Sequence, residues 1–357
     1  MADNAESNRK YQERVEKGLN EAFKRADEDT LALDRDQVVI FSDHHRGDRD
    51  GADDFWRCER AYHAALAYYL HHKYKLILLG DVEELWENKP NKPLESYSKT
   101  LALEGKFHPG RLERFWGNHD DAWRHEGEVK KHLHGPFPGL TVREALRLKV
   151  TDGGEPVGTI FLVHGHQGTL DSDRWSFVSR FFVRYGWRPI QRRFKMASTT
   201  PARSFALRAA HDQAMFRWAL ERKRDERLVL IAGHTHRPVF SSPKPSPERS
   251  AEEVNEELVA LQAQENPDQE RIAELYAELE FVATPPFEEP PKEMPVPCYF
   301  NTGCCSFGDG DITGIEIGGG EIRLVRWLND KYEPRKKQLA DPRNVREVFA
   351  AVVAERP

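Results

Sequence analysis

Residues 39–48, VIFSDHHRGD, join an apolar run to a group of polar side chains that can bind metal ions, and the fold can be worked out from this stretch. Its first three residues are β-branched or aromatic and favour a strand. The run then ends in Asp43, His44 and His45. Taken alone, the pattern fits both an ordinary strand followed by a polar turn and one part of a metal site. The choice depends on whether other strands along the chain end in the same way.

Length and composition describe a soluble protein with one large domain or two moderate ones. The chain has 357 residues, of which 39% are hydrophobic and 31% are charged, and a chain of this length can bury a sizeable core. Its formal net charge is −6. An acidic balance argues against a dedicated nucleic-acid-binding protein.

The sequence predicts neither a membrane span nor a secreted protein. Its apolar runs are all shorter than the roughly 18 residues that a spanning helix needs, and its first residues lack the apolar core of a secretory signal. Two of the four cysteines are adjacent, Cys304 and Cys305, and the set does not form a disulfide framework. We therefore expect a cytoplasmic protein.

A series of short apolar runs, each bounded by Gly, Asp or His, predicts strands that alternate with helices. The predicted strands lie within residues 37–45, 75–84, 112–120, 158–167, 227–236 and 298–307, with a closing hairpin around Gly318 to Gly320. A helix is expected over residues 54–73 between the first two strands. This alternation indicates an α/β architecture.

Three further segments complete the predicted organisation. Residues 1–30 form an N-terminal helix, because apolar residues from Tyr11 to Phe23 recur at four-residue spacing. Residues 31–357 form a single domain that carries two insertions. The first insertion, 171–225, is helical and rich in Arg and aromatic residues, whereas the second, 241–297, is rich in Pro and Glu.

The same kind of polar residue follows each predicted strand. These residues are Asp43 and His45, Asp81 and Glu84, Asn118 with His119 and Asp120, His164 and His166, His234 and His236, and Asn301. One such end is usually a turn or a helix cap. Because ligands gather beyond the carboxyl ends of strands in α/β sheets, five or six of them in one chain favour a common site.

The order of these residues resembles the calcineurin-like metallophosphoesterase family over residues 38–237. The resemblance rests on Asp43-x-His45, Gly80-Asp81-x-x-Glu84, Gly117-Asn118-His119-Asp120, His164, and Gly233-His234-x-His236. It implies an αββα fold, in which a two-sheet β-sandwich is flanked by helices, with a two-metal site at one edge.

The resemblance also implies which residues hold the metal ions. One divalent ion would bind Asp43, His45 and His236, a second would bind Asn118, His164 and His234, and Asp81 would bridge the two. Mixed carboxylate, amide and imidazole ligands suit Mn, which is our preferred metal, or Fe, Zn and Ni. Two such ions stabilise charge on both reacting oxygens of a phosphoester and lower the pKa of a bridging water, which then serves as the nucleophile.

Three other histidines have different expected roles. His119 resembles the family histidine that protonates the leaving oxygen or holds the phosphate, with Asp120 fixing its tautomer. His166 is an alternative to His164 as a ligand, and we favour His164 because it follows the apolar run directly. His44 points to the opposite face of the strand from Asp43 and His45, and we expect it not to bind metal.

Two features bear on the substrate. The run from Gly80 to Trp86 is similar to the GD-x-x-E-x-W run of the UDP-2,3-diacylglucosamine hydrolase branch, although that branch has Arg at the position of His119 and Asp at that of His166. In the 171–225 insertion Arg180, Arg184 and Arg188 recur every four residues. On a helical cap, they would hold a pyrophosphate or a phosphorylated headgroup, or contact an anionic membrane surface.

The sequence therefore predicts a phosphodiesterase, pyrophosphohydrolase or phosphatase acting on a phosphorylated small molecule or a nucleotide-containing substrate. A nuclease and a catalytically vestigial metal-binding module are the alternatives. The sequence does not predict an oligomeric state.

Overall fold

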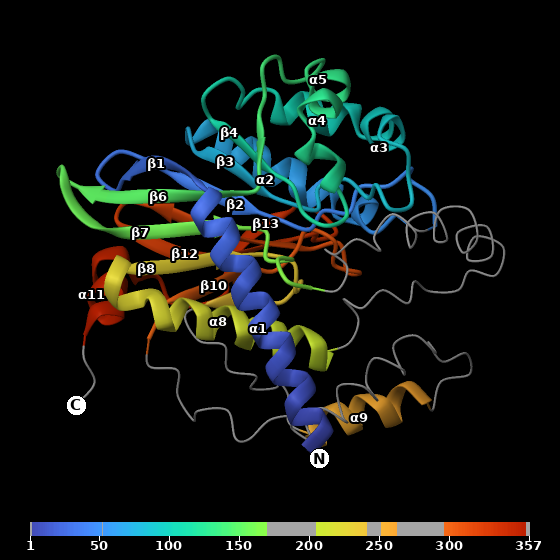
Figure 1. Cartoon of the computed structure of the whole chain (residues 1–357). Helices are drawn as coiled ribbons and strands as arrows, with labels where there is room; N and C mark the ends of the chain where they lie inside the picture. Colours follow the sequence, from blue (N-terminus) through green and yellow to red (C-terminus); the bar gives the residue numbers. More distant parts are fainter. Residues whose placement is uncertain (1, 52, 170–204, 241–250, 263–295, 355–357) are drawn as a thin grey trace.

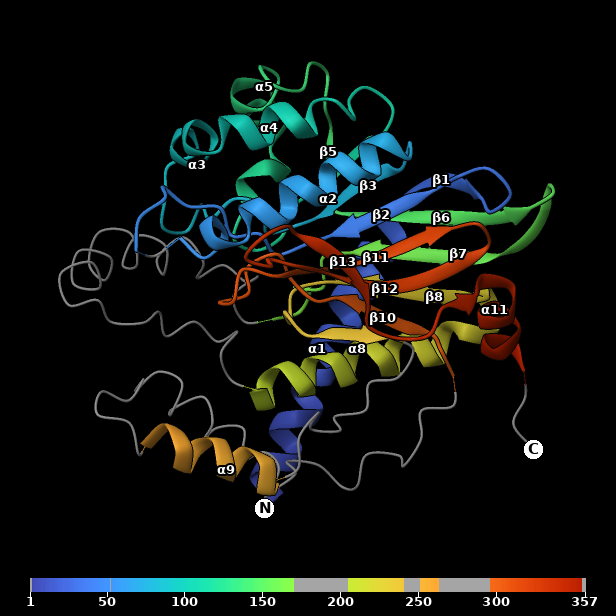
Figure 2. The same ribbon diagram turned by 180° about the vertical axis from the view of Figure 1, so that it is seen from behind.

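Two β-sheets packed face to face form the centre of the protein, and helices cover both outer faces (Figure 1). The structure is a computed structural model, which describes residues 2–51, 53–169, 205–240, 251–262 and 296–354. Figure 2 shows the same layers from behind. The predicted fold class, a two-sheet β-sandwich flanked by helices, is confirmed.

The first sheet has six strands, of which the inner ones pair mostly in parallel. In spatial order they are β1 (Asp27–Ala32), β6 (Ala145–Asp152), β7 (Glu155–Val163), β8 (Leu228–Ala232), β10 (Tyr299–Thr302) and β9 (Pro238–Phe240). β7, β8 and β10 run in the same direction, so their carboxyl ends lie at one edge of the sheet.

The second sheet has a parallel half and an antiparallel half. In spatial order its strands are β13 (Arg335–Gln338), β12 (Glu321–Leu328), β11 (Ile312–Gly318), β2 (Val38–Phe41), β3 (Lys75–Leu79), β4 (Leu112–Phe115) and β5 (Val142–Arg143), and β14 (Arg343–Asn344) pairs with β12. β2 to β5 are parallel, whereas β11 to β13 are antiparallel.

Helices lie on both sides of the sandwich. They are α1 (Ala2–Arg25), α2 (Glu59–His71), α3 (Asn91–Ser96), α4 (Ser98–Glu104), α5 (Glu126–His132), α8 (Phe205–Glu226), α9 (Ala251–Gln262) and α11 (Val345–Val353), with short 3-10 helices at Phe55–Arg57 and Asp121–Arg124. α2 to α5 cover the second sheet, whereas α1, α8 and α11 cover the first (Figures 1 and 2).

Alternation along β2 shows how one apolar run serves two cores. Val38 and Ile40 pack between the two sheets, whereas Val39 and Phe41 pack against the helices of the outer layer. All four side chains are buried. A strand buried on both faces is apolar at every position, which explains the continuous run in the sequence.

The structure differs from the sequence prediction at the N-terminus. α1 ends at Arg25, and residues 27–32, the first four of which were expected to continue the helix, form β1, which pairs with β6. β1 (DEDTLA) is acidic and exposed over its first four residues, so its sequence lacks the apolar pattern of a strand. The predicted apolar face of the helix is buried, because Val15, Leu19 and Phe23 lie in the core.

The described part of the chain includes no helix long and apolar enough to cross a membrane. All four cysteines are buried and free. Much of both predicted insertions lies outside the described residues, namely within residues 170–204, 241–250 and 263–295. The described parts of the two insertions are α8 and α9.

Candidate metal centre

Polar side chains from both sheets meet at the carboxyl ends of the parallel strands. β2, β3 and β4 lead to Asp43, Asp81 and Asn118, respectively. β7 leads to His164, and β8 leads to the loop that holds His234 and His236. The predicted ligands therefore come from five strands of two sheets.

These side chains form three groups whose ligand atoms lie within 4.8 Å of one another: Asp43, His45 and His236; His45, Asp81 and His119; and Asp81, His164 and His234. Atoms bound to one cation at about 2.0–2.2 Å lie up to about 4.4 Å apart, so small side-chain shifts would bring such a group to a common ion. The first and third groups match the two ligand sets that the sequence predicts, apart from Asn118. Asp81 belongs to the second and third groups, and its Oδ2 lies 3.9 Å from Nε2 of His45, a member of the first.

Individual distances show how closely the donor atoms face one another. His45 Nε2 lies 3.1 Å from His236 Nε2, and the latter lies 3.4 Å from Asp43 Oδ1. On the other side, His164 Nε2 lies 3.1 Å from Asp81 Oδ2. Lone pairs of imidazole and carboxylate that point at each other over such distances repel unless a cation or a proton lies between them.

The backbone at the site is held in an uncommon conformation. Within the described residues, eight non-glycine residues have positive φ, and five of them are predicted ligands: Asp43, His45, Asp81, His234 and His236, with φ from 50° to 69°. Such residues each cost free energy and persist where the surrounding structure enforces them, which is common at functional sites.

Gly117 shows how tightly the loops approach one another. A Cβ atom at this position would lie 2.2 Å from Asp81 Oδ1 and 2.7 Å from His164 Cδ2. Only glycine allows the loop after β4 to bring Asn118 beside these two side chains. The glycine of the Gly-Asn-His-Asp motif thus has a steric cause.

Asn118 Oδ1 and His164 Nε2 are among the buried polar atoms of the described residues that have no hydrogen-bond partner. Because an unpaired buried polar group is costly, such atoms call for a ligand. His164 Nδ1 donates to Leu79 O at 2.8 Å, which leaves Nε2 with a free lone pair, as in histidines that bind metal. The donor set therefore fits divalent cations.

The pKa shifts describe a site that attracts positive charge. Burial opposes the charge of Asp81, yet His164 and His119 hold its pKa well below the ordinary value. Burial likewise disfavours protonated His45 and His164, but the neighbouring carboxylates raise the pKa of His45 to about 10 and that of His164 to about 9. A bound cation would supply the same positive charge and displace these protons.

His119 has a defined orientation. Its Nδ1 lies 2.6 Å from Glu84 Oε2, and its ring stacks on the half-buried Trp86 with 4.0 Å between ring centroids. Glu84 Oε2 also lies 3.1 Å from His45 Nδ1. Burial lowers the pKa of His119, but Glu84 and Asp81 outweigh this and raise it.

The contacts of Asp120 differ from the predicted contact with His119. The Asp120 carboxylate accepts backbone N–H groups instead, from Gly117 at 2.6 Å and from Val82 at 2.8 Å. Asp120 follows His119 directly, and its side chain turns back toward the loop after β3. Glu84 makes the contact that the sequence assigned to Asp120, so Asp120 joins two loops rather than contacting a reacting group.

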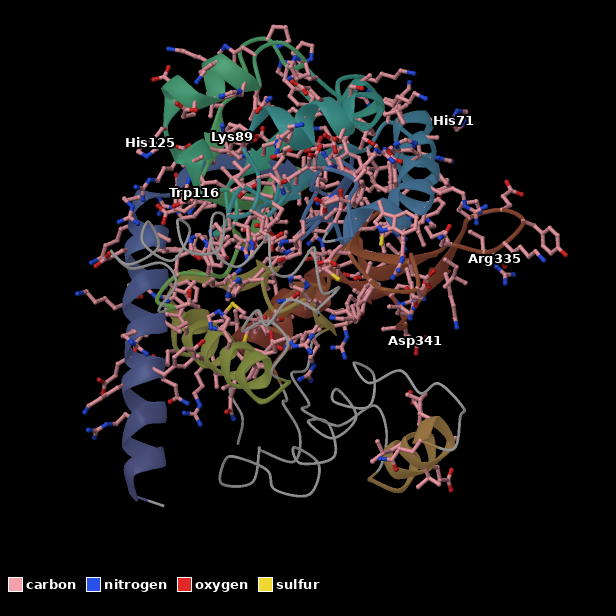
Figure 3. The ribbon with its side chains drawn as sticks, turned by 90° about the vertical axis from the view of Figure 1, so that its right-hand side faces the viewer. His71, Lys89, Trp116, His125, Arg335 and Asp341 are labelled. Carbon is pink, nitrogen blue, oxygen red and sulfur yellow. The ribbon has the colours of Figure 1, made fainter. Side chains whose placement is uncertain are left out.

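His166, the alternative ligand, and His44 both lie outside the ligand groups. His166 is buried beside Trp116 and does not belong to any of the three groups. Figure 3 labels Trp116 on the same side of the molecule as α1. His44 lies among Phe55 and Tyr62 on the helix side of its sheet. Arg180, Arg184 and Arg188 lie outside the described residues.

Fold and site together define a class: an αββα sandwich with a cluster of histidine and aspartate side chains suited to divalent metals at one edge. A sequence model of the calcineurin-like phosphoesterase family matches residues 37–238, which is more than half of the chain. The chain belongs to this family, whose activity is phosphoester hydrolysis with divalent metals.

Other comparisons add little to this assignment. No curated protein sequence matches the chain. Among solved structures, vacuolar protein sorting 29 from Cryptosporidium parvum is 13% identical, with 87% of this chain and 98% of that chain covered at a TM-score of 0.34. A predicted phosphoesterase from Streptococcus pneumoniae is 13% identical; the match covers 85% of this chain and 97% of that chain, with a TM-score of 0.29. Likenesses at this level carry no argument about function.

Proposed function

We propose that the chain is a binuclear-metal phosphoester hydrolase, which acts as a phosphodiesterase, pyrophosphohydrolase or phosphatase. One ion would bind Asp43, His45 and His236, the other Asn118, His164 and His234, with Asp81 between them. The observation that supports this most strongly is the pair of three-residue groups that match these ligand sets, Asp43 with His45 and His236, and Asp81 with His164 and His234, next to the unpartnered atoms Asn118 Oδ1 and His164 Nε2.

Two divalent ions, with Mn²⁺ preferred over Fe, Zn or Ni, would lower the pKa of a water between them and stabilise charge on the phosphoryl oxygens. The remaining chemistry belongs to the chain. His119 is held by Glu84 at Nδ1 and by Trp86 at its face, so its Nε2 is the nitrogen available to a leaving oxygen. We propose that this nitrogen donates the proton that the leaving group needs.

α8 of the predicted 171–225 insertion packs on the first sheet; we further propose that the part of this insertion before α8 forms a cap over the site of a cytoplasmic enzyme, within the 31–357 domain. Its arginines Arg180, Arg184 and Arg188 would contact a second phosphate or another anionic part of the substrate. The GD-x-x-E-x-W run supports a nucleotide diphospho-lipid as one candidate substrate. Replacing all three arginines by Ala should then raise KM for a diphosphate ester while leaving kcat on a small aryl phosphate unchanged.

Metal removal tests the proposed function directly. The purified protein should hold close to two divalent ions per chain by elemental analysis, and chelation should abolish hydrolysis of an aryl phosphate or a bis-aryl phosphate. Mn²⁺ should restore the activity. A folded protein that binds ions only substoichiometrically and hydrolyses none of the esters would instead be a vestigial metal-binding module.

A substrate panel separates the remaining alternatives. Nucleotide sugars, nucleotides, simple monoesters and single-stranded DNA are compared under the same Mn²⁺ conditions. Cleavage of DNA at rates above those of the small esters, with binding that weakens steeply as salt rises, would identify a nuclease instead.

A further inference from the structure

Two adjacent residues of α8, His211 and Asp212, contact the two loops that carry the histidine ligands of the first sheet. His211 Nε2 lies 2.5 Å from the carbonyl oxygen of Gly165, which directly follows His164. The Asp212 carboxylate accepts the hydroxyl of Thr235 at 3.0 Å, and Thr235 lies between His234 and His236. Neither α8 residue belongs to the ligand groups.

The His211 ring connects α1 to the loop after β7. A carbonyl oxygen only accepts hydrogen bonds, so His211 donates through Nε2–H, and its Nδ1 accepts from the Tyr11 hydroxyl at 2.6 Å. α1 also contacts the same loop directly: a Cβ atom at Gly18 would lie 2.7 Å from Gly168 N. The loop that begins at His164 is thus fixed by both helices, which cross each other at a large angle (Figures 1 and 3).

Asp212 is the centre of a buried network behind the loop after β8. It is 1% exposed and accepts the Tyr299 hydroxyl at 2.7 Å in addition to that of Thr235. The amide of Asn301 donates to Thr235 Oγ1 at 3.2 Å and to Gly233 O at 2.7 Å. This network supports a loop in which His234 and His236 have φ of 69° and 57°, a conformation that persists only where neighbours enforce it.

The two loops are also joined to each other, since Gly233 N donates to His164 O at 2.9 Å. Contacts of this kind, from groups that do not touch the metal, fix the orientation of ligand rings. We propose that His211 and Asp212 are positioning residues, which hold His164, His234 and His236 in the geometry that binds the metal ions. The inference rests on the proposed metal centre.

Metal affinity measured without substrate tests the inference. The full chain is stripped of metal, and its apparent Kd for Mn²⁺ is measured by competition with a chromogenic chelator. Asp212→Ala removes the acceptor of two buried hydroxyls, and His211→Phe removes both ring contacts. Each should raise the Kd by about 10- to 100-fold, the usual effect of losing a partner of a metal ligand. Tyr11→Phe, which removes one contact further out, should raise it less.

Conservative variants separate positioning from packing. Asp212→Asn keeps an oxygen that accepts from Thr235 and Tyr299, and His211→Gln keeps one donor and one acceptor, so both should recover most of the affinity. The matched control is Trp218→Phe, on the same helix as His211, which loses a partly buried hydrogen bond to Asn20 of α1 (2.8 Å). It should lower the unfolding midpoint and leave the Kd unchanged.

The outcomes are distinguishable from a failure of the metal centre itself. If Asp81→Asn binds Mn²⁺ as tightly as the parent protein, the proposed centre is wrong. If Asp81→Asn loses affinity while folded Asp212→Ala and His211→Phe do not, only the positioning roles are wrong. Equal loss in Trp218→Phe would also overturn them, since it would show general destabilisation. Should Asp212→Ala not fold, His211→Phe and Tyr11→Phe decide the question by the same criteria.

Discussion

The two sheets contribute unlike halves to the candidate centre. After β2, β3 and β4 the ligands are mainly carboxylate and amide groups, and their supporting contacts come from the same short motifs, through Glu84 and Asp120. After β7 and β8 the ligands are histidines, and their supporting contacts come from α8 and β10, which carry no predicted ligand. One half is supported by residues of the ligand-bearing motifs themselves, and the other by residues of neighbouring elements.

This difference shows what holds a metal site together in such a fold. A strand end can place a ligand within a few residues, but a histidine ring also needs a fixed tautomer and a fixed rotation. The hydrogen bond from Nδ1 to Leu79 O fixes the tautomer of His164. The buried network around Asp212 supports the loop of His234 and His236. Substitutions in the two halves should therefore have different consequences.

The largest effect is expected from Asp81→Asn, because Asp81 is the predicted bridging carboxylate and belongs to two of the three ligand groups. Losing the shared carboxylate weakens both ion positions, and metal ions contribute several kcal/mol to the reaction. Turnover of an aryl phosphate at saturating Mn²⁺ should fall by about 1,000-fold or more, since each 1.36 kcal/mol corresponds to a factor of about ten.

The control for this substitution is Asp341→Asn, at an exposed carboxylate remote from the site (Figure 3). It should keep both turnover and metal content. Unchanged turnover in Asp81→Asn would show that the two halves do not share a ligand.

A smaller effect is expected from His119→Ala, which removes the proposed proton donor and no predicted ligand. General acid catalysis contributes about 100- to 10,000-fold, so kcat should fall within this range. Elemental analysis should find the metal content intact. His125→Ala, at an exposed histidine nearby in sequence, is the matched control; loss of both ions in His119→Ala would make this residue a ligand instead.

Glu84→Gln should reduce turnover by about 10- to 100-fold, because Glu84 contacts His45 and His119 rather than substrate. The variant to compare with Glu84→Gln is Asp120→Asn. Asp120 accepts backbone N–H groups of two loops, so its replacement should lower the free energy of unfolding by about 1–3 kcal/mol. Turnover measured well below the unfolding midpoint should change less than in Glu84→Gln, and the opposite ranking would restore Asp120 as the partner of His119.

Much of the fold could be predicted from the sequence because the site-bearing strands are buried on both faces and read as apolar runs. All six predicted runs contain strands, and the αββα class is confirmed. β1 and β6 escaped prediction, since acidic or alternating charged residues mask them. Strand pairing across two sheets also depends on contacts between distant segments, which no local pattern records.

The same physics limits what could be predicted of the site. Predicted ligands follow strands directly, so their types and spacing are visible in the sequence. Tyr11, His211 and Asp212 lie on helices with no motif around them, and only packing brings them to the ligand loops. The contacts of Asp120 differ from the prediction for a related reason: Asp120 is nearest to His119 in sequence, but the backbone turns its carboxylate away.

The smallest effect is expected from Trp86→Phe, which separates two contacts of one side chain. Phe keeps a ring to stack on His119, but it loses the indole N–H that donates to Asn118 O at 2.6 Å. One such hydrogen bond contributes about 1 kcal/mol, so the Mn²⁺ Kd of the weaker site should rise about five-fold while the pH profile of kcat stays unchanged. A changed pH profile with unchanged metal affinity would mean that Trp86 acts through His119 alone. The residues after β4 would then depend on the motif after β3 as well as on their own.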